Sequence, residues 1–173
     1  MKKFLFYVAL AAVALAPAAA QSQMMSATTT VYGAGAHGFD AFVGTWSCTN
    51  VMPSPMGGPT HTTLTVARTS LPGVIYYHSV GTGFDNAWYN VYVPSKKMWQ
   101  SPFIVSDGSY GTETTTQTGK KIVWVGTAYF AASGKTMSIR DTNVNSPNKY
   151  TDLGEVQSGG AWKTQYSVSC TRS

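Results

Sequence analysis

Two stretches of the chain indicate its fold most clearly: GTWSC at residues 44–48 and WKTQYSVSC at residues 162–170. They hold both cysteines, and in each stretch the tryptophan and the cysteine are an even number of residues apart. Side chains so spaced in a β-strand share one face. The two sets predicted to share a face are Trp46 with Cys48, and Trp162 with Tyr166, Val168 and Cys170. A first and a last strand that a disulfide can join predict a sheet closed on itself.

The composition indicates an all-β protein. The residues after position 20 include 22 Thr and 14 Val but only three Leu, and threonine and valine favour strands. Ten strand-like runs are separated by short turn sequences rich in Gly, Pro, Asn, Asp and Ser. The runs lie at about 44–52, 61–69, 74–81, 87–93, 98–105, 109–117, 121–130, 135–143, 148–156 and 161–171.

Connections of two to six residues predict that sequential strands are antiparallel neighbours. Without helices to cover them, ten such strands form either a closed barrel or a two-sheet sandwich. A disulfide between Cys48 and Cys170 favours the barrel, because its geometry requires Cα atoms within about 7 Å. An outer-membrane barrel fits poorly, because the run at 109–117 is polar on both faces. We therefore expect one up-and-down antiparallel β-barrel of about ten strands.

The N-terminal residues 1–20 resemble a secretory signal peptide: Lys2 and Lys3 precede a short apolar run that ends in three alanines. We expect an exported protein, periplasmic or extracellular, with no membrane span after cleavage. Residues 21–37 are expected to form a flexible leader and residues 38–173 the barrel domain. A helical turn at 37–43 would plug one end of the barrel. Two cysteines in an exported protein favour a disulfide.

The GxW triplet at residues 44–46 resembles the opening of the calycins, a superfamily that includes lipocalins, fatty-acid-binding proteins and nitrobindin-like barrels. With FVGTWSC at 42–48, VPSKKMW at 93–99 and the final aromatic strand, the layout is most similar to secreted bacterial domains of the DUF1579 type, which have no assigned function. The resemblance covers about residues 38–171. It implies a calycin-like barrel whose interior binds an apolar or amphipathic small molecule.

Two departures from these families bear on cofactors. Nitrobindin-like haem barrels use a histidine late in the chain, whereas His37, His61 and His78 all lie in the first half. Fatty-acid-binding barrels carry a helix pair between their first two strands, and residues 52–60 contain three prolines and leave no room for it. We expect no haem and no other cofactor.

Alternation along the strands selects a set of residues expected to line the barrel lumen, most of them aromatic. Aromatic walls with a few polar groups are typical of ligand sites, although five tryptophans could also fill a small barrel and leave no cavity. Arg140 would hold a ligand carboxylate, stack on Trp46 or pair with Glu113 or Glu155 if it points inward; the simpler expectation is an exposed arginine. The expected lumen residues are Trp46, Tyr76, His78, Trp88, Tyr92, Trp99, Phe103, Trp124, Arg140, Trp162 and Tyr166.

Signatures of catalysis, metal binding and nucleic-acid binding are weak. The chain has no GxSxG, phosphate-loop or HExxH motif. Three scattered histidines predict no metal site. Asp141, Asp152 and Glu155 could form a carboxylate pair, but scattered surface carboxylates explain them more simply. After residue 20 the ten basic residues outnumber seven acidic ones without clustering, so we expect no nucleic-acid partner.

Three functions remain from the sequence. The first is a binding module that takes up a small hydrophobic or amphipathic molecule. The second is a structural or envelope-interaction protein with a filled barrel. The third, the least favoured, is an enzyme that uses the lumen and brings titratable groups together there.

Overall fold

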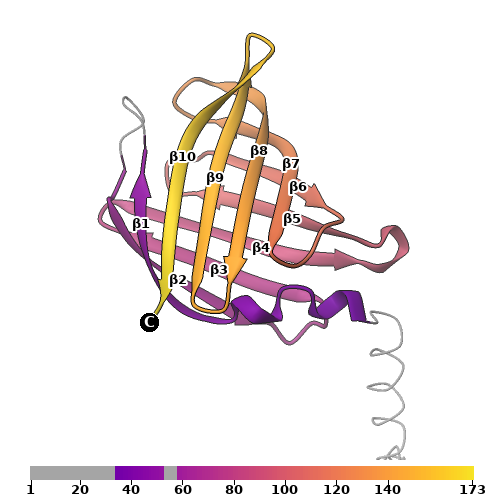
Figure 1. The fold of residues 1–173 in the computed structure, drawn as a ribbon. Coiled ribbons are helices and arrows are strands. Elements are labelled where there is room, and N and C mark those ends of the chain that lie inside the picture. Colours follow the sequence, from indigo (N-terminus) through magenta and orange to yellow (C-terminus); the bar gives the residue numbers. More distant parts are fainter. Residues whose placement is uncertain (1–33, 53–57) are drawn as a thin grey trace, which may run out of the picture.

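Ten antiparallel strands form a single closed up-and-down barrel in the computed structural model, which describes residues 34–52 and 58–173. Each strand pairs with its neighbours in sequence, and the last strand closes the ring against the first. In Figure 1, β8, β9 and β10 form the near wall, and β3 to β6 cross behind them. The expected barrel is confirmed. The expected signal peptide at 1–20 lies outside the described residues.

The strands coincide closely with the expected runs. The bounds are β1 Gly44–Val51, β2 His61–Arg68, β3 Val74–Gly81, β4 Phe84–Val93, β5 Met98–Val105, β6 Tyr110–Thr115, β7 Lys121–Phe130, β8 Lys135–Ser146, β9 Lys149–Ser158 and β10 Ala161–Arg172. Strands β4 and β8 each extend three residues beyond expectation. The reason at β4 is a tighter turn than expected: Gly81 pairs with Phe84, and Gly83 takes a φ of +68° that suits glycine.

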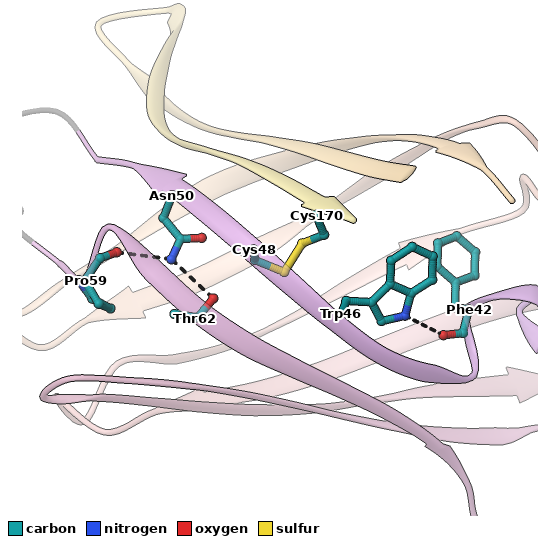
Figure 2. The surroundings of a disulfide bond; sticks show 7 residues. All are labelled: Phe42, Trp46, Cys48, Asn50, Pro59, Thr62 and Cys170. Carbon is teal, nitrogen blue, oxygen red and sulfur yellow. Dashed lines mark hydrogen bonds between the residues drawn. A yellow bond between two sulfur atoms is a disulfide. The ribbon is translucent and has the colours of Figure 1, made fainter. Parts of the chain in front are cut away.

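Ring closure places Cys48 of β1 directly opposite Cys170 of β10, with Cα atoms 4.0 Å apart and a disulfide between them. Figure 2 shows this bond on the inner side of β1, between Asn50 and Trp46. Both cysteines are buried. The predicted disulfide is thus confirmed, and it joins the two ends of the meander.

A short helical segment plugs one end of the barrel. Two 3-10 helices, η1 (Ala34–His37) and η2 (Asp40–Phe42), precede β1. Phe39 between them is 2% exposed and packs edge-on against Trp99, with ring centroids 4.6 Å apart. The Trp46 indole donates a hydrogen bond of 2.9 Å to the Phe42 carbonyl, drawn in Figure 2. The expected helical plug is present, and η1 lies in the range expected to be leader.

Arg172, at the end of β10, fastens this plug to the barrel. Its guanidinium lies 4.3 Å from the centroid of the Trp46 ring and donates hydrogen bonds to the Val43 and Ala41 carbonyls. The apolar core gathers around the same end. Its buried members are Phe39, Trp46, Cys48, Leu64, Val66, Ile75, Tyr77, Trp99, Ile122, Trp124, Tyr150 and Cys170.

Candidate functional site

The barrel contains a cavity of about 1050 Å³, and the plug residues Phe39 and Phe42 line its closed end. It reaches the rim formed by the β3–β4 turn at Gly83, the β5–β6 turn at Asp107 and the β7–β8 turn at Ala132. Several inward positions toward this rim carry small side chains, among them Ser79, Ser101 and Ala128. Trp46 and Trp99, in contrast, are buried beside the plug. A ten-stranded barrel is wide enough to enclose a small molecule once such positions are small.

Four of the eleven expected lumen residues line this cavity: Trp88, Phe103, Trp124 and Tyr166. Trp88 and Phe103 face each other across the β4–β5 pair. Trp88 also stacks on Tyr77, with ring centroids 4.9 Å apart. Together these rings make one side of the cavity aromatic. Whether they contact a ligand remains a prediction.

Three further expected residues point inward but lie in the plugged half. Trp46 and Trp99 are each 1% exposed, and Tyr92 packs on Trp99. None of the three lines the cavity. The five tryptophans therefore do not fill the barrel: Trp46 and Trp99 pack beside the plug, and Trp88 and Trp124 form part of the cavity wall.

Tyr76 and His78 lie on the outer face of β3, so the expectation that they line the lumen is wrong. Their neighbours Ile75, Tyr77 and Ser79 are the buried residues of this strand. The His78 imidazole lies 2.8 Å from an Asp85 carboxylate oxygen on the outer surface. Because tyrosines occupy two successive positions, 76 and 77, the sequence offered two opposite registers for this strand.

Trp162 and Arg140 are also outside the lumen. A register shift between Thr164 and Tyr166 marks a bulge in β10, so residues before and after it face opposite ways. Tyr166, Val168 and Cys170 keep the predicted common face, and Trp162 leaves it. The Arg140 guanidinium lies 4.5 Å from the centroid of the Trp162 ring and pairs with Glu155 at 2.7 Å.

A cluster of carboxyl groups lies inside the cavity, although the sequence favoured scattered surface positions over a carboxylate pair. Glu113 of β6, Asp141 of β8 and Asp152 of β9 all line it. The Tyr166 hydroxyl donates to Asp141 at 2.6 Å and also lies 3.3 Å from an Asp152 oxygen. Asp141 and Asp152 are therefore not the scattered surface carboxylates that the sequence suggested. Glu155, grouped with them from the sequence, pairs instead with Arg140.

Hydrogen bonds from neighbouring side chains hold this cluster in place. The Asn143 amide donates to Asp152 at 2.7 Å and accepts from the Trp124 indole at 2.8 Å. The Tyr166 ring lies against Gly154 of β9, where a Cβ would collide with it. A glycine in a strand often marks such a close approach, and this was the one available signal that the aromatic ring lies across β9.

Burial shifts the pKa values of these acids upward. Desolvation raises the pKa of Asp141 to about 6, against opposing hydrogen bonds from Tyr166 and Glu113. Burial, reinforced by the charges of Asp141 and Asp152, raises the pKa of Glu113 well above its usual range. The pKa of Asp152 rises for the same two reasons, burial and the Asp141 charge. All three carboxyl groups are therefore easier to protonate than ordinary surface acids, and they titrate as a coupled set.

Within residues 34–52 and 58–173, no group of three or more His, Cys, Asp or Glu side chains is arranged to hold a metal ion. His37 pairs with Asp40 near the plug, and His61 is exposed at the start of β2. The expectations of no metal and no cofactor stay predictions. In the same described ranges, none of the helices has the length and apolar character needed to cross a membrane.

Comparison with known proteins supports the fold. No protein-family model and no curated protein sequence matches this chain. Among solved structures, the crystal structure of Rv2717c from M. tuberculosis is similar, with a TM-score of 0.61 and 12% sequence identity. The match covers 82% of this chain and 98% of that one. At this identity the likeness extends to the barrel fold alone.

Proposed function

We propose that this protein is an exported binding barrel that holds a small amphipathic molecule in its lumen. The observation that carries the proposal is the cavity of about 1050 Å³ open at the end away from the plug. Ligand pockets of drug-sized molecules span roughly 300–1,000 Å³. The cavity weighs against the alternative of a filled structural barrel, because that alternative leaves no interior space.

The walls of the cavity favour an amphipathic ligand over a purely apolar one. In a ring of ten strands, β4 and β9 are five places apart and so lie on opposite walls. Trp88 of β4 and Phe103 of β5 form an aromatic surface. Asp152 of β9 and Asp141 of β8 face them from the other side. A molecule with an apolar body and a polar end would satisfy both walls.

Export and a calycin-like relationship are part of the same proposal. The Cys48–Cys170 disulfide supports export, because such bonds persist in oxidising compartments. The closed ten-strand meander supports the calycin-like resemblance of the GxW opening. Cell fractionation followed by determination of the N-terminal residue tests export; protein confined to the cytoplasm with Met1 intact would contradict it.

Binding is tested with N-phenyl-1-naphthylamine, a neutral fluorophore that brightens in apolar surroundings. We expect saturable binding together with quenching of tryptophan emission, because Trp88 and Trp124 line the cavity. Ser101→Trp places a large ring in the lumen and should abolish binding. Thr65→Trp, at an exposed position of β2, is the matched control and should leave it intact. Equal binding by both variants would place the probe outside the lumen and refute the proposal.

Acid–base chemistry on the bound molecule is a second candidate function. The observation in its favour is that Glu113, Asp141 and Asp152 converge in the lumen with raised pKa values, as catalytic acids and bases do. Native mass spectrometry of protein purified from its own source would identify a retained molecule. Catalysis predicts that fresh protein alters the mass of that molecule and that Asp141→Asn does not. If neither protein alters the mass of the molecule, binding without catalysis is the function that remains.

A further inference from the structure

We propose that the carboxyl groups of Glu113, Asp141 and Asp152 bind a protonated amine at the polar end of the ligand. This inference rests on the proposed binding function and names the chemical class that the lumen selects. The ligand would carry an ammonium group on an aromatic or aliphatic body.

The first argument is a buried carboxyl oxygen of Glu113 that has no hydrogen-bond partner. Glu113 is 5% exposed and lines the cavity, and its Oε1 atom has no hydrogen-bond partner. Leaving a buried polar atom unpaired costs about 1–3 kcal/mol, more for a charged group. The amide oxygens of Asn86 and Asn90, on the lumen side of β4, are also buried without partners. The lumen is therefore short of hydrogen-bond donors.

The second argument is that, among the described residues, no cationic side chain pairs with Glu113, Asp141 or Asp152. Over the described residues, the cavity wall contains no lysine, arginine or histidine. Arg140, on the same strand as Asp141, is turned outward and pairs with Glu155. Buried charges in proteins are paired or bound to a counter-ion. A cationic ligand would supply the missing partner.

Existing hydrogen bonds orient the carboxyl groups for such a ligand. Tyr166 bridges Asp141 and Asp152, and Asn143 fixes the other oxygen of Asp152. These contacts come from β8, β9 and β10, so the polar wall is held by rigid strands rather than by loops. An ammonium group has three donors and no acceptor, which suits a wall built from carboxylate oxygens.

The electrostatics of the wall agree with this assignment. Mutual repulsion contributes to the raised pKa values of Glu113 and Asp152, and Asp141, with a pKa of about 6, is mostly ionised at neutral pH. The charge of Glu155, which pairs with Arg140, adds to the rise in the pKa of Asp141. Burial raises the pKa values of Tyr150 and Tyr166, which also face the cluster, so these two hydroxyls stay neutral. A bound ammonium would relieve the repulsion and lower the pKa values of the acids.

Three probes of matched shape test the proposal: 1-naphthylmethylamine, 1-naphthalenemethanol and 1-naphthoic acid, which at pH 7.5 are cationic, neutral and anionic. Calorimetry should show that the amine binds about 10-fold to 100-fold more tightly than the alcohol, as expected for charge-assisted hydrogen bonds. The acid should bind most weakly. In the variants Glu113→Gln and Asp141→Asn the amine's advantage should fall to about threefold or less.

The controls distinguish loss of the preference for the amine from misfolding of the variants. Asp85→Asn removes the same charge from the outer face of β4 and should keep the full preference for the amine. Unchanged binding of the alcohol by Glu113→Gln and Asp141→Asn shows that their cavities are intact. If amine, alcohol and acid bind the native protein equally, the inference is wrong and the proposed function stands. If none of the three binds, the proposed function fails and the inference with it.

Discussion

The carboxyl cluster should make the free energy of unfolding fall as pH rises, whereas paired surface carboxylates usually make it rise. Asp141 has a folded-state pKa of about 6, against an ordinary value of 3.8. Between these values the folded protein holds a proton that the unfolded chain has released. The unfolded state then binds fewer protons, so the free energy of unfolding falls as pH rises through this window.

The size of the effect follows from the shift of about two pKa units at roughly 1.4 kcal/mol each, which amounts to about 3 kcal/mol between pH 4 and pH 7. This is an upper limit for Asp141, because water entering the cavity would stabilise its charge. The pKa values of Glu113 and Asp152 shift in the same direction and add to the trend. Asp141→Asn keeps an acceptor for Tyr166 and removes the titration.

The assay is urea unfolding at pH 4 and pH 7 under non-reducing conditions, for the native protein, Asp141→Asn and the surface control Asp85→Asn. Asp141→Asn removes the titration of Asp141 and also the charge that raises the pKa values of Glu113 and Asp152, so the comparison measures Asp141 together with its coupling to these two acids. We expect the native protein to gain more stability on acidification than Asp141→Asn does. The reasoning is refuted if the two show the same pH dependence, or if Asp141→Asn gains more.

Four further predictions concern the disulfide, the plug, the outer face and the lumen. Replacing both Cys48 and Cys170 by alanine should lower the free energy of unfolding by about 4–5 kcal/mol on the chain-entropy model, since the bond spans 122 residues; a loss under about 1 kcal/mol in urea titrations would contradict it. Arg172→Ala should lower the free energy of unfolding by about 1–3 kcal/mol and speed amide hydrogen exchange at residues 39–43. Arg172→Lys should not restore either, because lysine lacks the planar guanidinium that lies over Trp46. Amide exchange at the native rate in Arg172→Ala would argue against this role. Arg140→Ala, which breaks a partly exposed pair, should cost about 1 kcal/mol or less and leave probe binding unchanged; weakened binding would show that Arg140 acts on the lumen. The affinity for 1-naphthylmethylamine should rise about tenfold from pH 5 to pH 8 as Asp141 ionises, while that for the alcohol stays level; a flat amine profile would be inconsistent with binding at Asp141.

Most of the architecture was predictable because its signals are local. Turn residues at short intervals and a shortage of leucine indicated a meander of β-strands. The even spacing of tryptophan and cysteine at each end indicated closure, and the structure pairs Cys48 with Cys170. Short-range chemistry also predicted the plug, since Phe39 and Phe42 flank a helical turn next to the first strand.

The cavity wall was less predictable, because the inward face of a strand depends on register. In β3, Tyr76 and Tyr77 are equally good candidates for the interior, and only pairing with β2 and β4 turns Tyr77 inward. In β10, one bulge separates Trp162 from Tyr166. In β6, threonines alternate with Glu113 on a strand with no apolar face, so no pattern marked Glu113 as buried.

By itself, the sequence determined that the chain forms a closed all-β meander joined at its ends, because strand propensity, turn chemistry and cysteine spacing are properties of short segments. Only the tertiary structure decided what the barrel encloses. Asp141, Asp152 and Glu113 belong to three different strands, and they meet because the register of the whole ring brings them to one wall. Their raised pKa values arise from that meeting and from burial, which are properties of the packed interior.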